Sequence, residues 1–223
     1  AQQESASGLN PFVKYWMHVG FLVNKEEKMS KSTGNFSNLK DLLKDYPPET
    51  IRSYLLSGAD YGSPLDFSID ILNSVNSAQK NMSKSLRRVE LYKNKGVFKK
   101  GSVHTDKYKS LIEGSFDNDL KIPMAIGALN NLVSLIDAVT RDGDAFSLED
   151  YDELKKIISF FDKLGVIPKE PEIPENIKEL VKQRENVRLN GDWSKADNFR
   201  LQVIDKGYEI DDTPYGPLIS PLP

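Results

Sequence analysis

The chain has 223 residues, of which 39% are hydrophobic and 28% charged, and a formal net charge of −3. This composition and length are those of a globular protein with one large domain or two small ones. The slightly negative net charge is not the basic overall charge of a general nucleic-acid binder. No apolar run approaches the roughly 18 residues that span a bilayer. The absence of cysteine excludes disulfides and thiolate metal sites, and the two histidines are too far apart in sequence to suggest a zinc site within the chain.

Residues 1–66 contain one expected strand, Val19–Val23, which is ended by the charged turn Asn24–Glu27. A single strand needs a sheet to be stable, and no other convincing strand lies nearby in the sequence. We therefore expect residues 1–66 to be the last part of an α/β domain, with the chain beginning partway through it.

Two short helices are expected next. Asn38 is expected to cap the first, while Pro48 suits the first turn of the second and Gly58 its end. The apolar side of the first helix is expected at Leu39, Leu42 and Leu43. The inner face of the second is expected at Ile51, Tyr54 and Leu55.

Residues 67–167 show the spacing of three and four that is typical of packed helices. A long helix is expected after Ser68, followed by helices near 105–114, from Pro123 to Gly143, and near 148–164. The core-facing stripe of the long helix is expected at Ile71, Val75, Ala78, Met82, Leu86 and Val89. The third helix should bury Ile126, Leu129, Val133 and Ile136, and the last Leu154, Ile157, Ile158, Phe161 and Leu164. These stripes need one another for burial, which predicts an antiparallel helical bundle.

Three prolines within residues 168–174 exclude regular helix there and predict a linker. Residues 175–223 are then expected to form a small module with two helices, one short strand at Tyr208–Ile210, and a proline-rich tail. The predicted fold class is therefore mainly α, with part of an α/β domain, a bundle, and a small C-terminal α(+β) module.

The segment Lys28-Met29-Ser30-Lys31-Ser32 follows the expected strand and precedes the turn Thr33–Asn35. Two ammonium groups on a mobile loop suit a triphosphate, because they stabilise the charge that develops on departing pyrophosphate more than they stabilise bound ATP. A solvated polar turn is the alternative. Met82–Ser85 repeats four of the five letters inside the long helix, where only Met82 should face the core.

The context of this segment resembles the class I aminoacyl-tRNA synthetases, and among them the cysteinyl enzyme. The resemblance rests on Tyr15–His18, Lys28–Ser32, Gly34–Phe36 and Ser63–Leu65, and on the C-terminal segment Asp212–Gly216. It covers nearly the whole chain. The stretch Phe116–Pro123 is similar to an acidic family segment that ends in proline, but Lys121 and Ile122 depart from its usual small polar residues.

The resemblance implies a Rossmann-like catalytic domain whose C-terminal part is residues 1–66, a tRNA-binding bundle of the DALR type at 67–167, and an anticodon-side module at 175–223. It implies cysteine activation with ATP and Mg²⁺, transfer to tRNA(Cys), and a monomeric cytoplasmic enzyme with no membrane association. Lys28 and Lys31 would be catalytic, and Lys28, Met29, Ser30, Lys31 and Ser32 would bind ATP, with Lys31 the strongest candidate.

The family's second ATP motif and the ligands of its Zn²⁺ are not found in this chain, which is expected to open just after the zinc-ligand stretch; no metal ligand is expected here. The chain alone is therefore expected to be inactive. For RNA, the candidates are five residues of the module: Arg184, Arg188, Trp193 and Arg200, which the resemblance includes, and the basic Lys195 beside them. Trp193 would either stack on a base or pack two helices together, and the basic residues would either bind phosphates or form a salt-bridged helix face.

Two other functions stay open. One is a cysteine ligase of thiol-cofactor biosynthesis, which would not need residues 175–223. The other is a non-catalytic helical RNA-binding protein, which would have no use for a pyrophosphate-binding loop.

Overall fold

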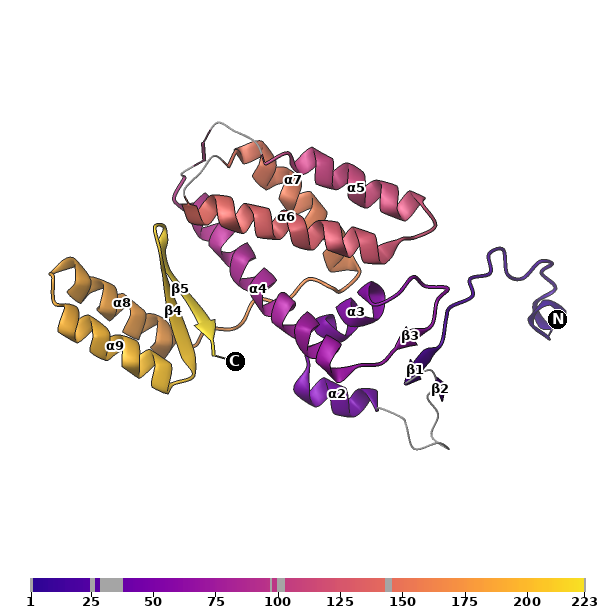
Figure 1. The fold of residues 1–223 in the computed structure, drawn as a ribbon, viewed down its shortest axis with the longest axis horizontal. Helices are drawn as coiled ribbons and strands as arrows, with labels where there is room; N and C mark the ends of the chain where they lie inside the picture. The colour runs from indigo at the N-terminus through magenta and orange to yellow at the C-terminus, as the bar shows by residue number, and fades with distance from the viewer. Residues whose placement is uncertain are drawn as a thin grey trace.

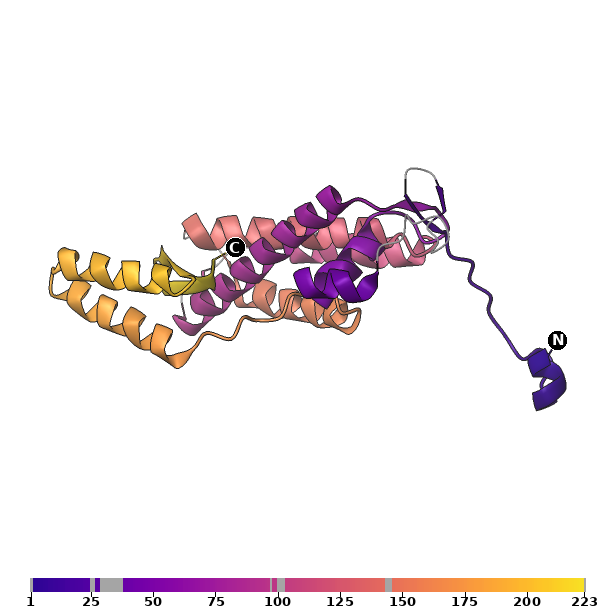
Figure 2. The same cartoon turned by 90° about the horizontal axis from the view of Figure 1, so that it is seen from below.

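The computed structural model describes residues 2–24, 27–28, 38–96, 98–99, 103–142 and 146–222. Over these residues the chain is mostly helical, as the sequence predicts. The molecule is elongated, with the N-terminal segment at one end, helices α4 to α7 in the middle and the C-terminal module at the other end (Figures 1 and 2). In chain order the elements are α1 (Gln2–Ser7), β1 (Leu22–Asn24), β2 (Glu27–Lys28), α2 (Leu39–Asp45), α3 (Pro48–Ser57), β3 (Leu65–Asp66), α4 (Ile69–Asn94), α5 (Thr105–Asp117), α6 (Ile122–Asp142), α7 (Leu148–Lys163), α8 (Glu175–Leu189), α9 (Trp193–Asp205), β4 (Tyr208–Thr213) and β5 (Gly216–Pro221).

A small sheet in the order β2-β1-β3 lies near the N-terminal end. Strand β1 pairs antiparallel with β2 and parallel with β3, with Val23 opposite Lys28 on one side and Asp66 on the other. The predicted strand Val19–Val23 is shorter in the structure and shifted toward Asn24. The prediction that no other strand lies nearby was wrong, because β2 and β3 have two residues each and are too short to leave an alternating pattern.

Helix α3 begins at Pro48 and is capped at Gly58, as predicted, and it buries Ile51 and Tyr54. Leu55 was wrongly placed on its inner face: it is 46% exposed, since each residue turns the helix by about 100°. Asn38 caps α2, its side-chain oxygen accepting from the backbone N–H of Lys40 at 3.1 Å. The expected apolar side of α2 is not buried, and Leu39 and Leu43 lie at the surface.

The 26-residue helix α4 starts after its N-cap Ser68, as predicted, but its first buried stripe was misplaced. Ile71 and Ala78 are not buried, and the neighbouring Leu72 and Gln79 are buried instead. The amide nitrogen of Gln79 donates to Ser53 Oγ (2.7 Å) and to the carbonyl of Val166 (3.0 Å), which explains a buried polar residue that periodicity of apolar residues cannot find. From Met82 onward the predicted stripe is confirmed at Met82 and Val89, with Leu86 partly buried.

The main hydrophobic core lies between α4, α5, α6 and α7, with α6 in contact with both α4 and α5. The predicted inner faces of α6 and α7 are buried, apart from Ile158 and Leu164, which are partly buried. Each fully buried leucine, isoleucine or phenylalanine contributes roughly 1.5–3 kcal/mol by leaving water. Among the described helices, α6 alone is long and apolar enough by composition to cross a membrane (Ile122–Arg141), and its position in this core accounts for that composition.

The linker at 168–174 has no regular structure, and the C-terminal module that follows packs α8 and α9 against a β4–β5 hairpin. Its own small core is Ile177, Val181, Val203 and Ile210. The predicted single strand was incomplete, because residues 216–221 form the second strand of the hairpin. Pro217 and Pro221 argued against a strand there, but a two-stranded hairpin has outer edges on which a missing N–H is tolerated.

The hairpin fastens this module to the bundle. Tyr215, at its turn, is buried in the main core and packs edge-on against Tyr92, with ring centroids 4.9 Å apart. Beside it the buried guanidinium of Arg88 donates both to Asp137 of α6 and to Asp211 of β4, the latter at 2.7 Å. The buried contacts that hold the module are therefore an aromatic anchor and the guanidinium of Arg88, and Lys84 and Arg87 add polar bonds from α4 to the hairpin.

Candidate functional site

The lysine–serine loop predicted to bind ATP is described only at its first residue. Lys28 ends β2, and its backbone lies opposite Val23 of β1. The side chain of Lys28 and the whole of Met29, Ser30, Lys31 and Ser32 lie outside the described residues. What the structure describes is the frame on either side of the loop: the sheet before it and α2 after it.

The loop at residues 58–64 holds this frame together through a close approach to Gly20. The N–H of Gly20 donates to the carbonyl of Tyr61 at 2.7 Å, and a Cβ at Gly20 would lie 2.0 Å from the carbonyl oxygen of Ser63. Only glycine fits this position without a shift of the backbone. Two further bonds, from Leu65 N–H to Phe21 O (2.9 Å) and from Phe67 N–H to Val23 O (2.8 Å), continue the pairing along β1.

Tyr54 of α3 joins this sheet to α4. Its hydroxyl donates to the carbonyl of Asp66 and accepts from the N–H of Ser68, both at 3.0 Å. Burial of the side chain raises the pKa of Tyr54, so the hydroxyl stays protonated and keeps both bonds. The end of β3 and the start of α4 are therefore fixed to one another at a single buried group.

At the other end of the molecule, three predicted RNA-binding arginines converge on one carboxylate, Asp212 of β4. Arg184, 4% exposed, makes two parallel bonds to it at 2.7 Å. Arg188 donates to the same carboxylate at 2.7 Å, and Arg200 approaches it at 3.7 Å. The hydrogen bond from Arg184 lowers the pKa of Asp212, and the same bond raises the pKa of Arg184. Arg184 is thus occupied inside the module, whereas Arg188 and Arg200 reach its surface.

Trp193 begins α9 and is 62% exposed, so its ring does not pack two helices together. The guanidinium of Arg188 lies over it, 5.8 Å from the ring centroid. Lys195, two residues further along α9, is exposed and paired with Asp192 at 2.7 Å. The structure therefore brings Arg188 and Trp193 together as an exposed cation–π pair on one edge of the module.

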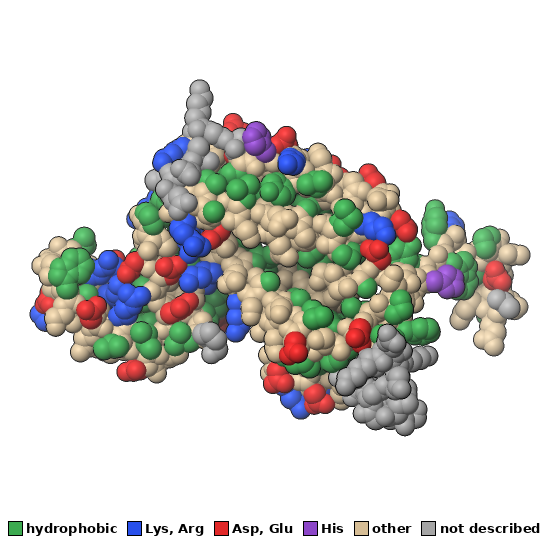
Figure 3. All heavy atoms as spheres, in the orientation of Figure 1, with side chains coloured by type: hydrophobic (Ala, Val, Ile, Leu, Met, Phe, Trp, Pro, Cys, Tyr) green, Lys and Arg blue, Asp and Glu red, His purple; other side chains and the backbone are tan. Residues whose placement is uncertain are grey.

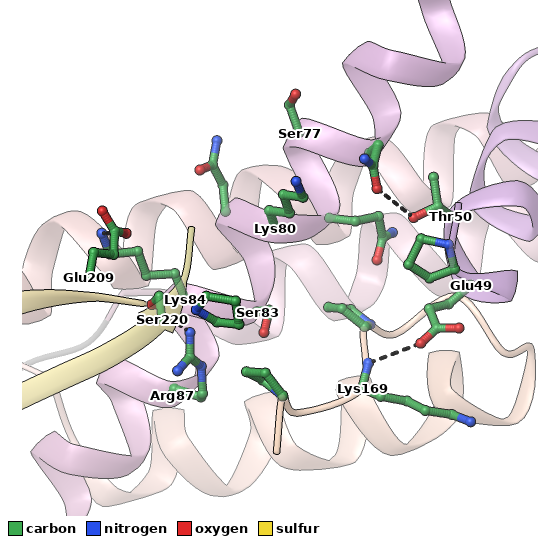
Figure 4. A pocket seen from close by; sticks show the side chains of 17 residues that line it. Glu49, Thr50, Ser77, Lys80, Ser83, Lys84, Arg87, Lys169, Glu209 and Ser220 are labelled. Atoms are coloured by element: carbon green, nitrogen blue, oxygen red, sulfur yellow. Dashed lines mark hydrogen bonds and ion pairs between the residues drawn. The ribbon is translucent and has the colours of Figure 1, made fainter. Parts of the chain in front are cut away.

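A groove of about 440 Å³ lies where α4, the linker and the hairpin meet (Figure 4). Lys80, Lys84 and Arg87 line it from α4, and Lys169 lines it from the linker. Lys84 pairs with Glu209 at 3.2 Å, while Arg87 donates only to neutral oxygens of the hairpin, Ile219 O and Ser220 Oγ. Within the described part of the chain, Lys80 and Lys169 form no ion pair. The groove is hence more basic than the chain as a whole.

The sequence contained a signal for this groove that was missed. Lys80, Lys84 and Arg87 are spaced by four and three, so they lie along one face of α4. Figure 3 shows basic side chains gathered over the module and its junction with the bundle, interleaved with acidic ones. No group of three His, Asp or Glu side chains among the described residues is close enough to hold a metal ion.

Comparison with known proteins gives a consistent result. Residues 1–77 match the family model described as tRNA synthetases class I (C) catalytic domain. The chain is 35% identical to a cysteine–tRNA ligase of Endomicrobium trichonymphae, over 97% of this chain and 46% of the relative. It is 33% identical to that of Pelotomaculum thermopropionicum (97% and 50%) and 30% identical to that of Thermodesulfovibrio yellowstonii (96% and 48%). The chain spans about half the length of the curated relatives it matches.

Proposed function

The chain is a relative of the class I cysteinyl-tRNA synthetases, and we propose that it forms part of a cysteine–tRNA ligase that activates cysteine with ATP and transfers it to tRNA(Cys). One observation carries this proposal: the similarity to cysteine–tRNA ligases runs along at least 96% of the chain, through the C-terminal module. A cysteine ligase that does not act on tRNA has no need of that module, and a non-catalytic RNA binder has no need of the residues that match a catalytic domain.

On the ATP side, the proposal assigns the departing pyrophosphate to Lys28 and Lys31, supported by Met29, Ser30 and Ser32. Ammonium groups held there would stabilise the charge that grows on the leaving group in the transition state. Mg²⁺ would accompany the phosphates of ATP and neutralise part of their charge. The proposal assigns neither Mg²⁺ nor Zn²⁺ to the described residues, where no suitable group of ligands occurs.

A substitution in the ligase that contains this chain tests the ATP side. Lys31→Ala should slow adenylate formation by about 100-fold or more, because the variant has one preorganised cation fewer to stabilise the developing charge. The affinity for tRNA(Cys) should change little. Equal decreases in both measurements would mean that Lys31 has a structural role, and this part of the proposal would be wrong.

On the RNA side, the proposal gives Trp193 and Arg188 the role of a platform for an unpaired base, with Lys195 and Arg200 contacting phosphates beside it. The exposed ring and the guanidinium fixed by Asp212 support this role. Arg184 receives a different role: its two bonds to Asp212 hold the strand that orients the other arginines. The groove of Lys80, Lys84, Arg87 and Lys169 would contact the RNA backbone between this platform and the bundle.

Binding of a tRNA(Cys) transcript to the 223-residue chain tests the RNA side. Trp193→Ala should weaken binding by about 5- to 150-fold, the range for removal of one base stack, and should reduce discrimination against a transcript with a changed anticodon. Lys80→Ala should flatten the dependence of log affinity on log salt by about 0.7–0.9 for each phosphate that is no longer neutralised, without changing that discrimination. Lys178→Ala is the matched control, since this exposed lysine of α8 pairs with its neighbour Glu175. If the chain bound tRNA(Cys) no better than unrelated RNA, the proposed function would fail.

A further inference from the structure

The turn between α5 and α6 has an unusual backbone. Asp119 and Leu120 both lie in the left-handed region, with φ of 53° and 51°. Left-handed backbone costs a residue with a Cβ roughly 1–2 kcal/mol, and such strain persists only where the surroundings favour it. A turn that merely joined two helices would be expected to use glycine or asparagine at these positions. That position 119 keeps a side chain despite this cost indicates that the side chain does something that glycine cannot.

Two polar side chains of this turn, those of Asp119 and Lys121, reach across to the loop at residues 58–64. The Asp119 carboxylate accepts from the Tyr61 hydroxyl at 2.9 Å, and the Lys121 ammonium pairs with Asp60 at 2.7 Å. The bond to Asp119 raises the pKa of Tyr61, and the bond to Asp60 raises the pKa of Lys121. Lys121 is also where the chain departs from the small polar residues expected in the acidic stretch, and the structure supplies the reason: it has a partner at Asp60.

The loop held by the turn is the one that supports the sheet. The carbonyl of Tyr61 accepts from Gly20, just before β1, and the same loop leads into β3, whose Leu65 pairs with Phe21. Strand β1 in turn pairs with β2, which ends at Lys28. An unbroken series of polar contacts thus runs from the bundle through residues 60–61 to the strand from which the lysine–serine loop leaves.

We propose that the turn at residues 118–121 is a latch: Asp119 and Lys121 are positioning residues that hold residues 60–61, and through them the three-stranded sheet, in place against the bundle. The inference rests on the proposed function in one respect: the sheet would serve to position the lysine–serine loop that is proposed to bind ATP. The contact of Asp119 and Lys121 with Tyr61 and Asp60 involves none of the residues proposed to bind ATP or tRNA. The latch would let the bundle, which is the stable part of the fold, set the position of a sheet too small to set its own.

Amide hydrogen exchange in the 223-residue chain tests the latch without any ligand. The reporters are the backbone N–H groups of Gly20, Leu65 and Phe67, each bonded across the sheet region. Lys121→Gln should raise their exchange rates about 2- to 5-fold, and Tyr61→Phe about 2- to 10-fold, as expected for removal of one exposed ion pair and one hydrogen bond. The amides of Leu129 and Leu132 in the core of α6 should not change.

A matched control and a rescue separate positioning from general stability. Lys109→Gln removes a pair of similar length on the same bundle, Lys109 to Glu153 at 2.9 Å, and should leave the sheet amides unaffected. The double variant Asp60→Lys with Lys121→Asp should restore protection toward the wild-type level. Unchanged sheet amides in both single variants, or a parallel rise at Leu129 and Leu132, would overturn the latch. Neither result bears on tRNA binding, which is measured separately.

Discussion

The two ends of the molecule are attached to the same bundle in different ways. The C-terminal module has its own core and is fastened by the buried Tyr215 and Arg88. The N-terminal sheet has a handful of backbone bonds, and the segment that leads into it carries exposed aromatic residues, with Tyr15 and Trp16 91% and 78% exposed. Exposed apolar side chains in such numbers mark a surface that normally contacts something else. A segment can therefore keep its backbone geometry through contacts with a stable neighbour even where its own side chains bury little.

The aromatic anchor of the module should give the largest effect. Tyr215→Ala removes a buried ring from the main core and should lower the free energy of unfolding by about 3–5 kcal/mol, measured by urea denaturation. Tyr215→Phe keeps the ring and should cost far less. A small effect of Tyr215→Ala would contradict the proposed difference between the two ends, because the C-terminal module would then not depend on a buried contact with the bundle.

The buried ion pair should come second. Arg88→Met leaves Asp137 and Asp211 without their shared partner and should cost about 2–3 kcal/mol, below the usual range for a broken buried pair because Arg141 still binds Asp137. Adding Asp137→Leu should recover part of this stability, since a buried carboxylate that keeps only the exposed Arg141 as its partner is then gone. Urea denaturation of the single and double variants measures both steps, and a double variant no more stable than the single one would contradict this account.

Acid should weaken the C-terminal module through Asp212. The pKa of Asp212 is lowered in the folded state by Arg184, so its contribution to stability is complete above the unfolded value of about 3.9 and is lost as the pH falls through the lower folded value. Amide exchange in α8 and α9 should therefore rise as the pH is lowered below about 4, beyond the intrinsic effect of pH. Asp212→Asn should show raised amide exchange already at about pH 6, with little further increase as the pH is lowered. Glu175→Gln, which removes one partner of an exposed ion pair, should behave like the wild type.

The smallest effect on global stability should come from α2, the helix beside the sheet, and comparison with α7 should show whether α2 unfolds separately from the bundle. Asn38→Ala removes the cap of α2, which buries no side chain, and should raise amide exchange in α2 without shifting the urea midpoint of the whole chain. Ser147→Ala removes the capping box of α7, within the core, and should cost about 1 kcal/mol of global stability. Equal global effects would show that α2 unfolds together with the bundle.

Much of the helical part of the fold could be predicted from sequence, because caps and apolar spacing act locally. Ser68, Pro48 and Gly58 mark helix ends, and the stripe at Ile126 and Leu129 is buried as expected. The errors came where burial depends on partners far away in sequence. Gln79 is buried because Ser53 and Val166 satisfy its amide nitrogen, which no local pattern indicates.

The candidate site could be predicted only in part, for the same reason. Sequence similarity pointed to the arginines of the module and to the segment that begins at Asp212, but not to the pairing between them, since Asp212 lies 28 residues from Arg184. The basic groove was readable from the spacing along α4, whereas Lys169, which completes it, comes from the linker. The residues expected to bind ATP stay a prediction, since all but the backbone of Lys28 lie outside the described residues.

Helix α4 has one further consequence. It runs uninterrupted for 26 residues, roughly 39 Å, from the Tyr54–Ser68 junction beside the sheet to Asn94, and Arg88 beside the hairpin lies about 30 Å along it. Inserting one residue midway would lengthen this rod by about 1.5 Å and rotate everything beyond by about 100°. Arg88 would then face away from Asp211, and the lysines would leave their groove. Insertions and deletions in α4 should therefore be tolerated only near whole numbers of turns, so that the spacing between the two ends can change only in steps of about 5.4 Å.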